Sequence, residues 1–253
     1  MKYITTNKLL TKSICLVSTA FTHLLLTTNT SLAAQFYGTT FGGDFIEIDE
    51  STGAGSFIGS TGFTNLRGLE IDSEGNIFAT SDSGLLINID RNTVIGTAIG
   101  SLGVIVEGLA FSNNILYGVA DFDGGGGAAE TLIRINPNNA NIAVIGEVGI
   151  GSGLSGTFRD LNSLAVNPSG QLFGLNAITN GVLDTSLVNI NSSTGQGTQS
   201  ASVTEIISGA DFDDNGIFYG IAVDDFGQAN NPSKFLTINP ISGAINDITR
   251  CAT

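Results

Sequence analysis

From residue 35 onward, short stretches of alternating apolar and polar residues recur along the chain. An aromatic residue followed by a small one occurs in five of them: QFYGTT (35–40), NIFATS (76–81), ILYGVA (115–120), QLFGLN (171–176) and IFYGIA (217–222). A period of two is typical of a half-buried strand, and the Gly, Asn and Asp residues between the stretches favour turns. The pattern therefore predicts strands and no helix of useful length after the N-terminal segment.

Other stretches repeat around each aromatic one. A stretch ending in Asp or Asn follows it each time: FIEID (45–49), LLINID (85–90), LIRIN (132–136), LVNIN (187–191) and FLTIN (235–239). A third short strand comes next. A further one precedes every aromatic stretch except the first: GLEID (68–72), GLAFS (108–112), SLAVN (163–167) and GADFD (209–213). We call the strand before the aromatic stretch a, the aromatic stretch b, the stretch ending in Asp or Asn c, and the third short strand d. Strand a is the innermost.

The spacing of the repeats sets the fold. The aromatic residues Tyr37, Phe78, Tyr117, Phe173 and Tyr219 are 41, 39, 56 and 46 residues apart by subtraction. Four short strands in each period of about 40–50 residues are typical of a propeller blade. We therefore predict an all-β fold, a β-propeller of about five four-stranded blades over residues 34–253.

The first blade begins at its b strand, so its inner strand should come from the C-terminal end of the chain. The final stretch INDITRCAT (245–253) shows no such pattern. Three alternatives follow: the tail forms this strand, the ring stays open, or the sequence is truncated. We favour truncation or a divergent end. An unpaired strand edge in this blade would favour aggregation.

The repeat GLxxx–xGxLYGxxx–LxxIN–xxTGxxxxIG resembles that of secreted bacterial propellers of the NHL and YVTN type. The resemblance covers most of residues 35–250. It implies a propeller in an exported protein, and it implies little about activity.

The N-terminal residues 1–33 have the features of a secretory signal peptide. Three lysines precede an apolar stretch, which ends in Ser31-Leu32-Ala33. The alternative is a membrane anchor, but polar residues from Ser18 to His23 interrupt the stretch before it reaches a spanning length. We expect cleavage after Ala33, a secreted or periplasmic protein, and no integral membrane span thereafter.

Charge and composition exclude several functions for residues 34–253. Cleavage removes three of 9 basic residues and none of 23 acidic ones, so the net charge becomes 9 − 3 − 23 = −17. Such a chain repels nucleic acid and anionic membranes and suits divalent cations. The single histidine, His23, is lost, and Cys251 is the one cysteine left. Ser-His-Asp and Cys-His catalysis and imidazole-based zinc sites are therefore excluded.

Long loops between strands b and c, and between d and the next a, belong on one face of the propeller, where binding usually resides. Acidic and basic residues gather in or beside them: Asp121, Asp123, Glu130, Arg159, Asp160, Asp224 and Asp225. We predict that this face binds a ligand or partner. The alternative is a solvated acidic rim.

The residue that begins each inner strand should face the central channel. These positions hold Arg67, Glu107, Asn162 and Ser208. In gluconolactonase-like propellers, carboxylate and amide groups near such positions hold a divalent metal. This sequence is similar in residue type at Glu107 and Asn162 only. The alternative is an Arg67–Glu107 ion pair between neighbouring blades.

The stretch GADFDDNGIFYG (209–220) contains the opening of a calcium loop, with Asp211, Asp213 and Asn215 as candidate ligands. A full loop would place Glu at the position of Ala222. Aspartate and glycine also favour the turn between strands a and b. We favour the turn, and calcium is the alternative.

Three functions remain open. The favoured one is a secreted, non-enzymatic binding module for an extracellular protein or polysaccharide, with calcium as the only cofactor considered. The others are a divalent-metal hydrolase of the lactonase kind and a structural component of an envelope or matrix.

Overall fold

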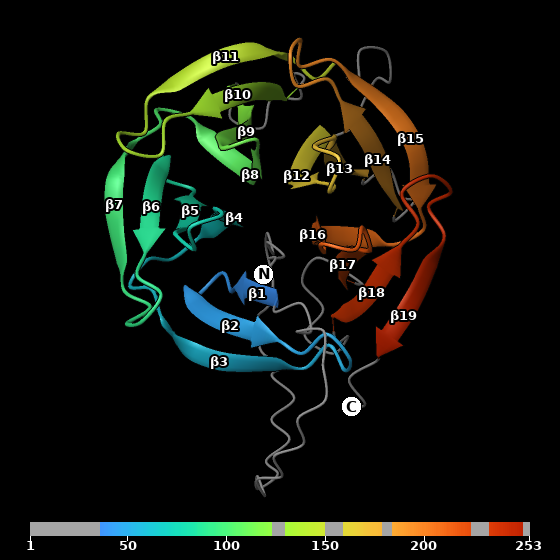
Figure 1. Cartoon of the computed structure of the whole chain (residues 1–253), viewed down its shortest axis with the longest axis horizontal. Helices are drawn as coiled ribbons and strands as arrows, with labels where there is room; N and C mark the ends of the chain where they lie inside the picture. Colours follow the sequence, from blue (N-terminus) through green and yellow to red (C-terminus); the bar gives the residue numbers. More distant parts are fainter. Residues whose placement is uncertain (1–35, 123–129, 150–158, 179–183, 224–232, 250–253) are drawn as a thin grey trace, which may run out of the picture.

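The protein forms a ring of antiparallel β-sheets around a central axis (Figure 1). The computed structural model describes residues 36–122, 130–149, 159–178, 184–223 and 233–249, which contain nineteen strands and no helix. The predicted signal peptide, residues 1–33, lies outside the described residues. Within this part of the chain, nothing helical is long and apolar enough to cross a membrane.

The sheets are five blades that follow one another along the chain. Blade 1 contains β1 (Phe36–Thr39), β2 (Asp44–Ile48) and β3 (Gly55–Ser60). Blade 2 contains β4 (Leu66–Ile71), β5 (Ile77–Ser81), β6 (Leu85–Ile89) and β7 (Gly96–Ser101). Blade 3 contains β8 (Ile105–Ser112), β9 (Ile115–Asp121), β10 (Thr131–Ile135) and β11 (Ile142–Glu147). Blade 4 contains β12 (Arg159–Val166), β13 (Leu172–Ile178), β14 (Asp184–Ile190) and β15 (Gly197–Val203). Blade 5 contains β16 (Ile206–Phe212), β17 (Phe218–Val223), β18 (Lys234–Ile238) and β19 (Ile245–Thr249).

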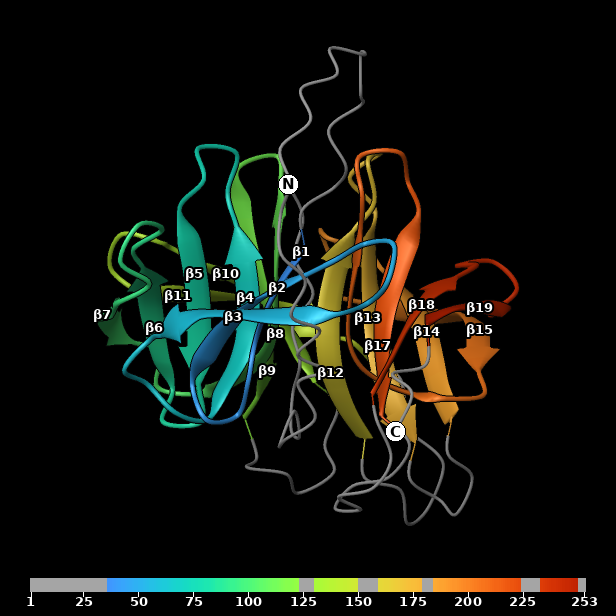
Figure 2. The ribbon, with the colours of Figure 1, turned by 90° about the horizontal axis from the view of Figure 1, so that it is seen from below.

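The prediction of a five-bladed propeller is confirmed. Each blade pairs its strands in chain order, and blades 2 to 5 have four strands each. The turns that join the inner strands to the b strands lie on one face, which we call the turn face (Figure 2). The b–c and d–a connections therefore leave from the opposite end of the blades, which we call the loop face.

The core lies between the blades rather than inside any one of them. Alternate side chains of each strand point to the two neighbouring blades, and each junction encloses its own group of buried apolar residues. Inner strands contribute to four of these junctions. The junction of blades 2 and 3, for example, buries Val106 and Leu109 of β8 against Phe78 and Leu86.

The five c–d turns share one local structure. Each c strand is followed by Asp or Asn, whose side chain accepts backbone N–H bonds within the turn. The fifth turn residue has positive φ and donates its N–H to the backbone carbonyl of the Asp or Asn. It is Gly in three blades but Val94 (φ 64°) and Ala140 (φ 60°) in the others. The predicted strand-to-turn motif is therefore confirmed.

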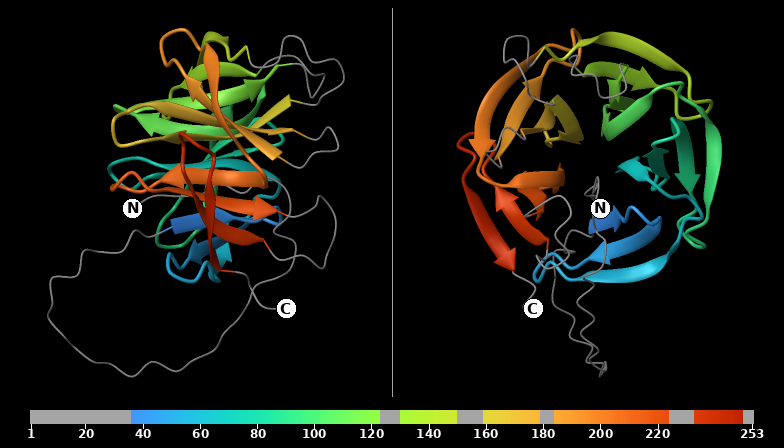
Figure 3. Two further views of the ribbon diagram at one scale, coloured as in Figure 1. Left: turned by 90° about the vertical axis from the view of Figure 1, so that its right-hand side faces the viewer. Right: turned by 180° about the vertical axis from the view of Figure 1, so that it is seen from behind.

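The first blade lacks a closing inner strand among the described residues, in agreement with the predicted alternatives to a strand supplied by the tail. Within the described residues, blade 1 has three strands and no strand from the C-terminal end pairs with β1. The last blade, β16–β19, lies beside blade 1 in the ring (Figure 3). Buried apolar side chains of the two blades pack together. Phe36 of β1 lies 4.6 Å from the ring of Tyr219 and 5.8 Å from that of Phe235. Aromatic packing thus closes the ring without a shared sheet.

Candidate functional site at the channel mouth

The four predicted channel-facing residues occupy one structural position. Each inner strand of blades 2 to 5 shifts register against its b strand at these residues: Arg67 in β4, Glu107 in β8, Asn162 in β12 and Ser208 in β16. A β-bulge bends the strand and re-aims the bulged side chain, and bulges are frequent beside functional sites. All four residues are buried, at 2–8% exposure. The sequence located these positions, but the bulge itself was not foreseen.

Small residues follow the bulges because the inner strands approach one another closely. A Cβ atom added to Gly108 would lie 2.5 Å from the backbone nitrogen of Leu164 in the next blade. At the equivalent position of blade 4, the Ser163 hydroxyl contacts the backbone of Ala210 at 3.3–3.4 Å. This close packing holds the bulges of neighbouring blades in fixed relative positions.

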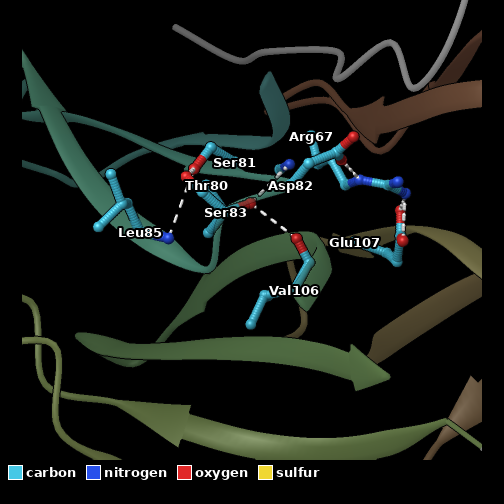
Figure 4. A network of polar contacts seen from close by, with 9 residues as sticks. Arg67, Thr80, Ser81, Asp82, Ser83, Leu85, Val106 and Glu107 are labelled. Carbon is cyan, nitrogen blue, oxygen red and sulfur yellow. Dashed lines mark hydrogen bonds and ion pairs between the residues drawn. The ribbon is translucent and has the colours of Figure 1, made fainter. Parts of the chain in front are cut away.

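Arg67 forms the centre of a buried ion-pair group (Figure 4). Its Nη1 donates to both carboxylate oxygens of Glu107 in blade 3, and its Nε donates to Asp82 in the b–c connection of blade 2. Burial by itself lowers the pKa of the Arg67 guanidinium. The bond to Asp82 and the charge of Glu107 together raise this pKa by more than burial lowers it, so it lies above its usual range. The group keeps a net charge of −1, because two carboxylates face one guanidinium.

The inter-blade pair anticipated as the alternative for Arg67 and Glu107 is therefore present. It engages the one carboxylate that the lactonase-like hypothesis needs. Ser208 is also committed, because its Oγ donates to the carbonyl of Ile221 at 3.2 Å. Among the described residues, no group of three or more His, Cys, Asp or Glu side chains could hold a metal.

A threonine fastens blade 2 to blade 3 beneath this ion-pair group. Thr80 Oγ1 accepts the N–H of Gly68 at 2.8 Å and donates to the carbonyl of Val106 at 2.7 Å. Gly68 and Val106 immediately follow Arg67 and precede Glu107, respectively. The bond thus fixes the backbone on which both charged residues stand (Figure 4).

The structure places only some of the predicted loop-face residues. Asp121 ends β9 and is half-buried, while Glu130 lies just before β10 and is 6% exposed. Arg159 and Asp160 belong to β12, but their side chains are not described. Asp123, Asp224 and Asp225 lie outside the described residues. The cluster is therefore brought together at Asp121 and Glu130 only.

The stretch at Asp213 is a hairpin turn on the turn face. The Asp213 carboxylate accepts the N–H groups of Asn215 and Ile217 at 3.0 and 2.6 Å, and Gly216 has a φ of 82°. Asp72 and Asn167 make the same pair of bonds in blades 2 and 4. These residues therefore form the turn that we favoured, and calcium binding at this stretch stays a prediction. Asp211 accepts the N–H of Phe212 at 2.8 Å, so it also serves the backbone.

Sequence reasoning missed several polar residues. Asp82 completes the group around Arg67, and its only sequence signal is its place directly after a b strand. Glu50 accepts a 2.8 Å bond from the Tyr219 hydroxyl across the closing junction. Lys234 pairs with Glu205 at 2.8 Å on the loop face of blade 5. These partners are 15 to 169 residues apart, a separation at which spacing gives no signal.

Comparison with known proteins adds little beyond the architecture. No protein-family model matches the sequence, and no curated protein matches it either. Among solved structures, it resembles the PQQ-bound aldose sugar dehydrogenase of Streptomyces coelicolor, with 15% identity and a TM-score of 0.48 over 71% of this chain and 61% of that one. It also resembles virginiamycin B lyase of Staphylococcus aureus, with 14% identity and a TM-score of 0.46 over 84% and 64%.

TolB of Acinetobacter baumannii has 11% identity and a TM-score of 0.48 over 83% of this chain and 49% of that one. The chain thus spans less than two thirds of the length of each of these three proteins. Similarity at this level indicates no activity, and the resemblance to NHL and YVTN propellers stays a prediction beyond the blade architecture.

Proposed function

We propose that this protein is a secreted, non-enzymatic propeller that binds an extracellular protein or polysaccharide through its loop face. One observation carries the proposal: four equivalent bulges each place a polar residue at the same position of successive inner strands, near the loop face. A rigid scaffold with polar groups at one end and long connections around them is a common design for binding.

The geometry favours binding over hydrolysis. A metal-dependent hydrolase needs an available carboxylate to hold the ion and an activated water. Glu107 instead accepts two bonds from Arg67, and the guanidinium occupies the space beside it. A structural role in an envelope or matrix is compatible with the same face, since it also requires a partner.

Binding can be tested with variants on the two faces. The purified chain of residues 34–253 would be titrated into a panel of extracellular polysaccharides and envelope proteins. We expect the loop-face changes Asp82→Asn and Asp121→Asn to weaken binding at least tenfold. The turn-face changes Glu74→Gln and Asp214→Asn are matched controls, because they also remove one exposed or half-exposed carboxylate each. Equal losses on both faces would contradict a loop-face site.

A further inference from the structure

Two adjacent large apolar residues are exposed on the outer strand of blade 1. Phe57 and Ile58 of β3 are 55% and 42% exposed, and β3 is the outermost strand of its sheet, at the periphery of the ring (Figure 1). Within the described part of the chain, the other exposed large apolar residues stand singly in the sequence: Ile95, Phe122, Val144, Ile217 and Ile241. Single exposed apolar residues are normal on a protein surface, whereas grouped ones mark interaction sites.

Ile95 of blade 2 extends this exposed group across the junction with blade 1. It is 60% exposed and directly follows Val94 in the c–d turn. A Cβ atom added to Gly59 would lie 3.2 Å from the Cβ atom of Val94. Gly59 directly follows Ile58, so the two exposed isoleucines are each one residue away from the same contact between the blades. We call Phe57, Ile58 and Ile95 the apolar strip.

The outer strand of blade 1 carries no charge. The chain has a formal net charge of −14, yet no charged residue occurs between Glu50 and Arg67. Of the other outer strands, β11 and β19 contain Glu147 and Asp247, while β7 and β15 have no large apolar side chain among the exposed ones. Among the five outer strands that the structure describes, β3 alone is therefore both uncharged and apolar at its surface.

This combination fits a second copy of the same chain. Two acidic chains repel each other, so they associate most readily where neither presents a carboxylate. A cationic partner would gain more from the acidic surfaces than from an uncharged strip. The nearest carboxylates in the sheet are those of Asp44 and Glu47 in β2, which pair with Ser60 and Ser56 at the two ends of β3. They flank the apolar strip and leave its centre uncharged.

We propose that the apolar strip is the interface of a weak homodimer, in which a twofold axis brings the strips of two copies together. Three exposed apolar side chains per copy form a small contact, so we expect a Kd of about 10–100 µM. The strip lies at the periphery of the ring, and a dimer would therefore leave both loop faces accessible. The proposed binding function is a separate claim, on which the dimer does not depend.

Sedimentation equilibrium of the chain of residues 34–253 tests the proposal. Between about 1 and 300 µM, we expect the average mass to rise from that of a monomer toward that of a dimer. Added NaCl should strengthen the association, because salt screens the repulsion between the two acidic chains. Contact between oppositely charged surfaces would instead weaken as NaCl is added.

Two variants with the same change in charge make the test specific. Phe57→Lys should weaken self-association about tenfold or more, because it places a charge in the apolar strip. This variant lowers the net negative charge, so the loss could not result from added repulsion. Val144→Lys is the matched control and should dimerise like the wild type, because Val144 has the equivalent position in β11 and is 62% exposed.

A wild type that stays monomeric over this range at low and at high salt would overturn the proposal, as would a Phe57→Lys variant that dimerises at the wild-type Kd. Equal losses in Phe57→Lys and Val144→Lys would overturn it too, because the contact would then not be specific to β3. Partner binding is measured separately on the same proteins. Partner binding by a wild type that does not dimerise would reject only the dimer, and a dimer without partner binding would reject only the function.

Discussion

The junction between blades 5 and 1 differs from the junction between blades 2 and 3. In the latter, β8 buries two apolar side chains, and Thr80 and the Arg67 pairs bind the two blades together. In the former, the described residues provide no inner strand. Six buried residues form that core, against ten in the junction of blades 2 and 3.

Larger side chains compensate for the smaller number. Phe235 stands where the equivalent strands of blades 2, 3 and 4 carry Leu86, Leu132 and Leu187. Its ring stacks on Tyr219 at 5.4 Å, and Phe36 completes the group. Aromatic side chains bury more area each than Leu. The comparison indicates that strand number and side-chain size are partly interchangeable at a blade junction.

Truncating the Phe36 side chain should have the largest effect on the free energy of unfolding. Phe36→Ala should lower the free energy of unfolding by about 4 kcal/mol, because it truncates a fully buried ring at the closing junction. Leu109→Ala in the junction of blades 2 and 3 is the matched control, with a loss of about 3 kcal/mol. Urea unfolding gives both values. Hydrogen exchange should show β1–β3 opening first in Phe36→Ala only, and uniform exchange in the two variants would contradict the comparison.

Breaking the ion pair between blades 2 and 3 should have the second-largest effect on the free energy of unfolding. Arg67→Met should cost about 3 kcal/mol, because Glu107 is 4% exposed and its buried carboxylate would lose the guanidinium that compensates its charge. The double variant Arg67→Met with Glu107→Leu should recover most of that loss, since it leaves no buried charge. A double variant as unstable as the single one would show that the pair serves more than charge compensation.

The hydrogen bond between Tyr219 and Glu50, at the junction of blades 5 and 1, should contribute least to the free energy of unfolding. Tyr219→Phe should lower stability by about 1 kcal/mol, because it removes the bond to Glu50 and keeps the ring packing. Chemical denaturation at pH 7 measures this loss. No loss would mean that the aromatic rings alone hold the junction.

Tyr219 should also make the stability of the folded protein depend on pH. Burial, the bond to Glu50 and the charges of Glu50 and Asp213 raise the pKa of Tyr219 above its ordinary value of 10.0. The unfolded chain therefore loses this proton first, and the stabilisation is full below pH 10 and is lost as the pH rises further. Stability of the wild type should fall more steeply above pH 10 than that of Tyr219→Phe. If the curves of stability against pH for the wild type and Tyr219→Phe ran parallel, the raised pKa of Tyr219 would be contradicted.

The repeats made the architecture predictable, whereas the contacts within the site were predictable only in part. Alternation and the recurring Asp or Asn gave strands and turns, because both depend on residues close in sequence. An ion pair between Arg67 and Glu107 could be named as an alternative, since the two residues hold equivalent positions in adjacent blades. Asp82 and Glu50 were missed because nothing local distinguishes them from ordinary loop residues.

The sequence by itself determined the number of blades, the order of the strands and the turn at Asp213. These features follow from local hydrogen bonding and from a pattern repeated five times. The tertiary structure decided how the ring closes and which carboxylates hold Arg67. Those outcomes depend on which side chains meet across blades, and the periodicity within a strand carries no information about its neighbour across the junction.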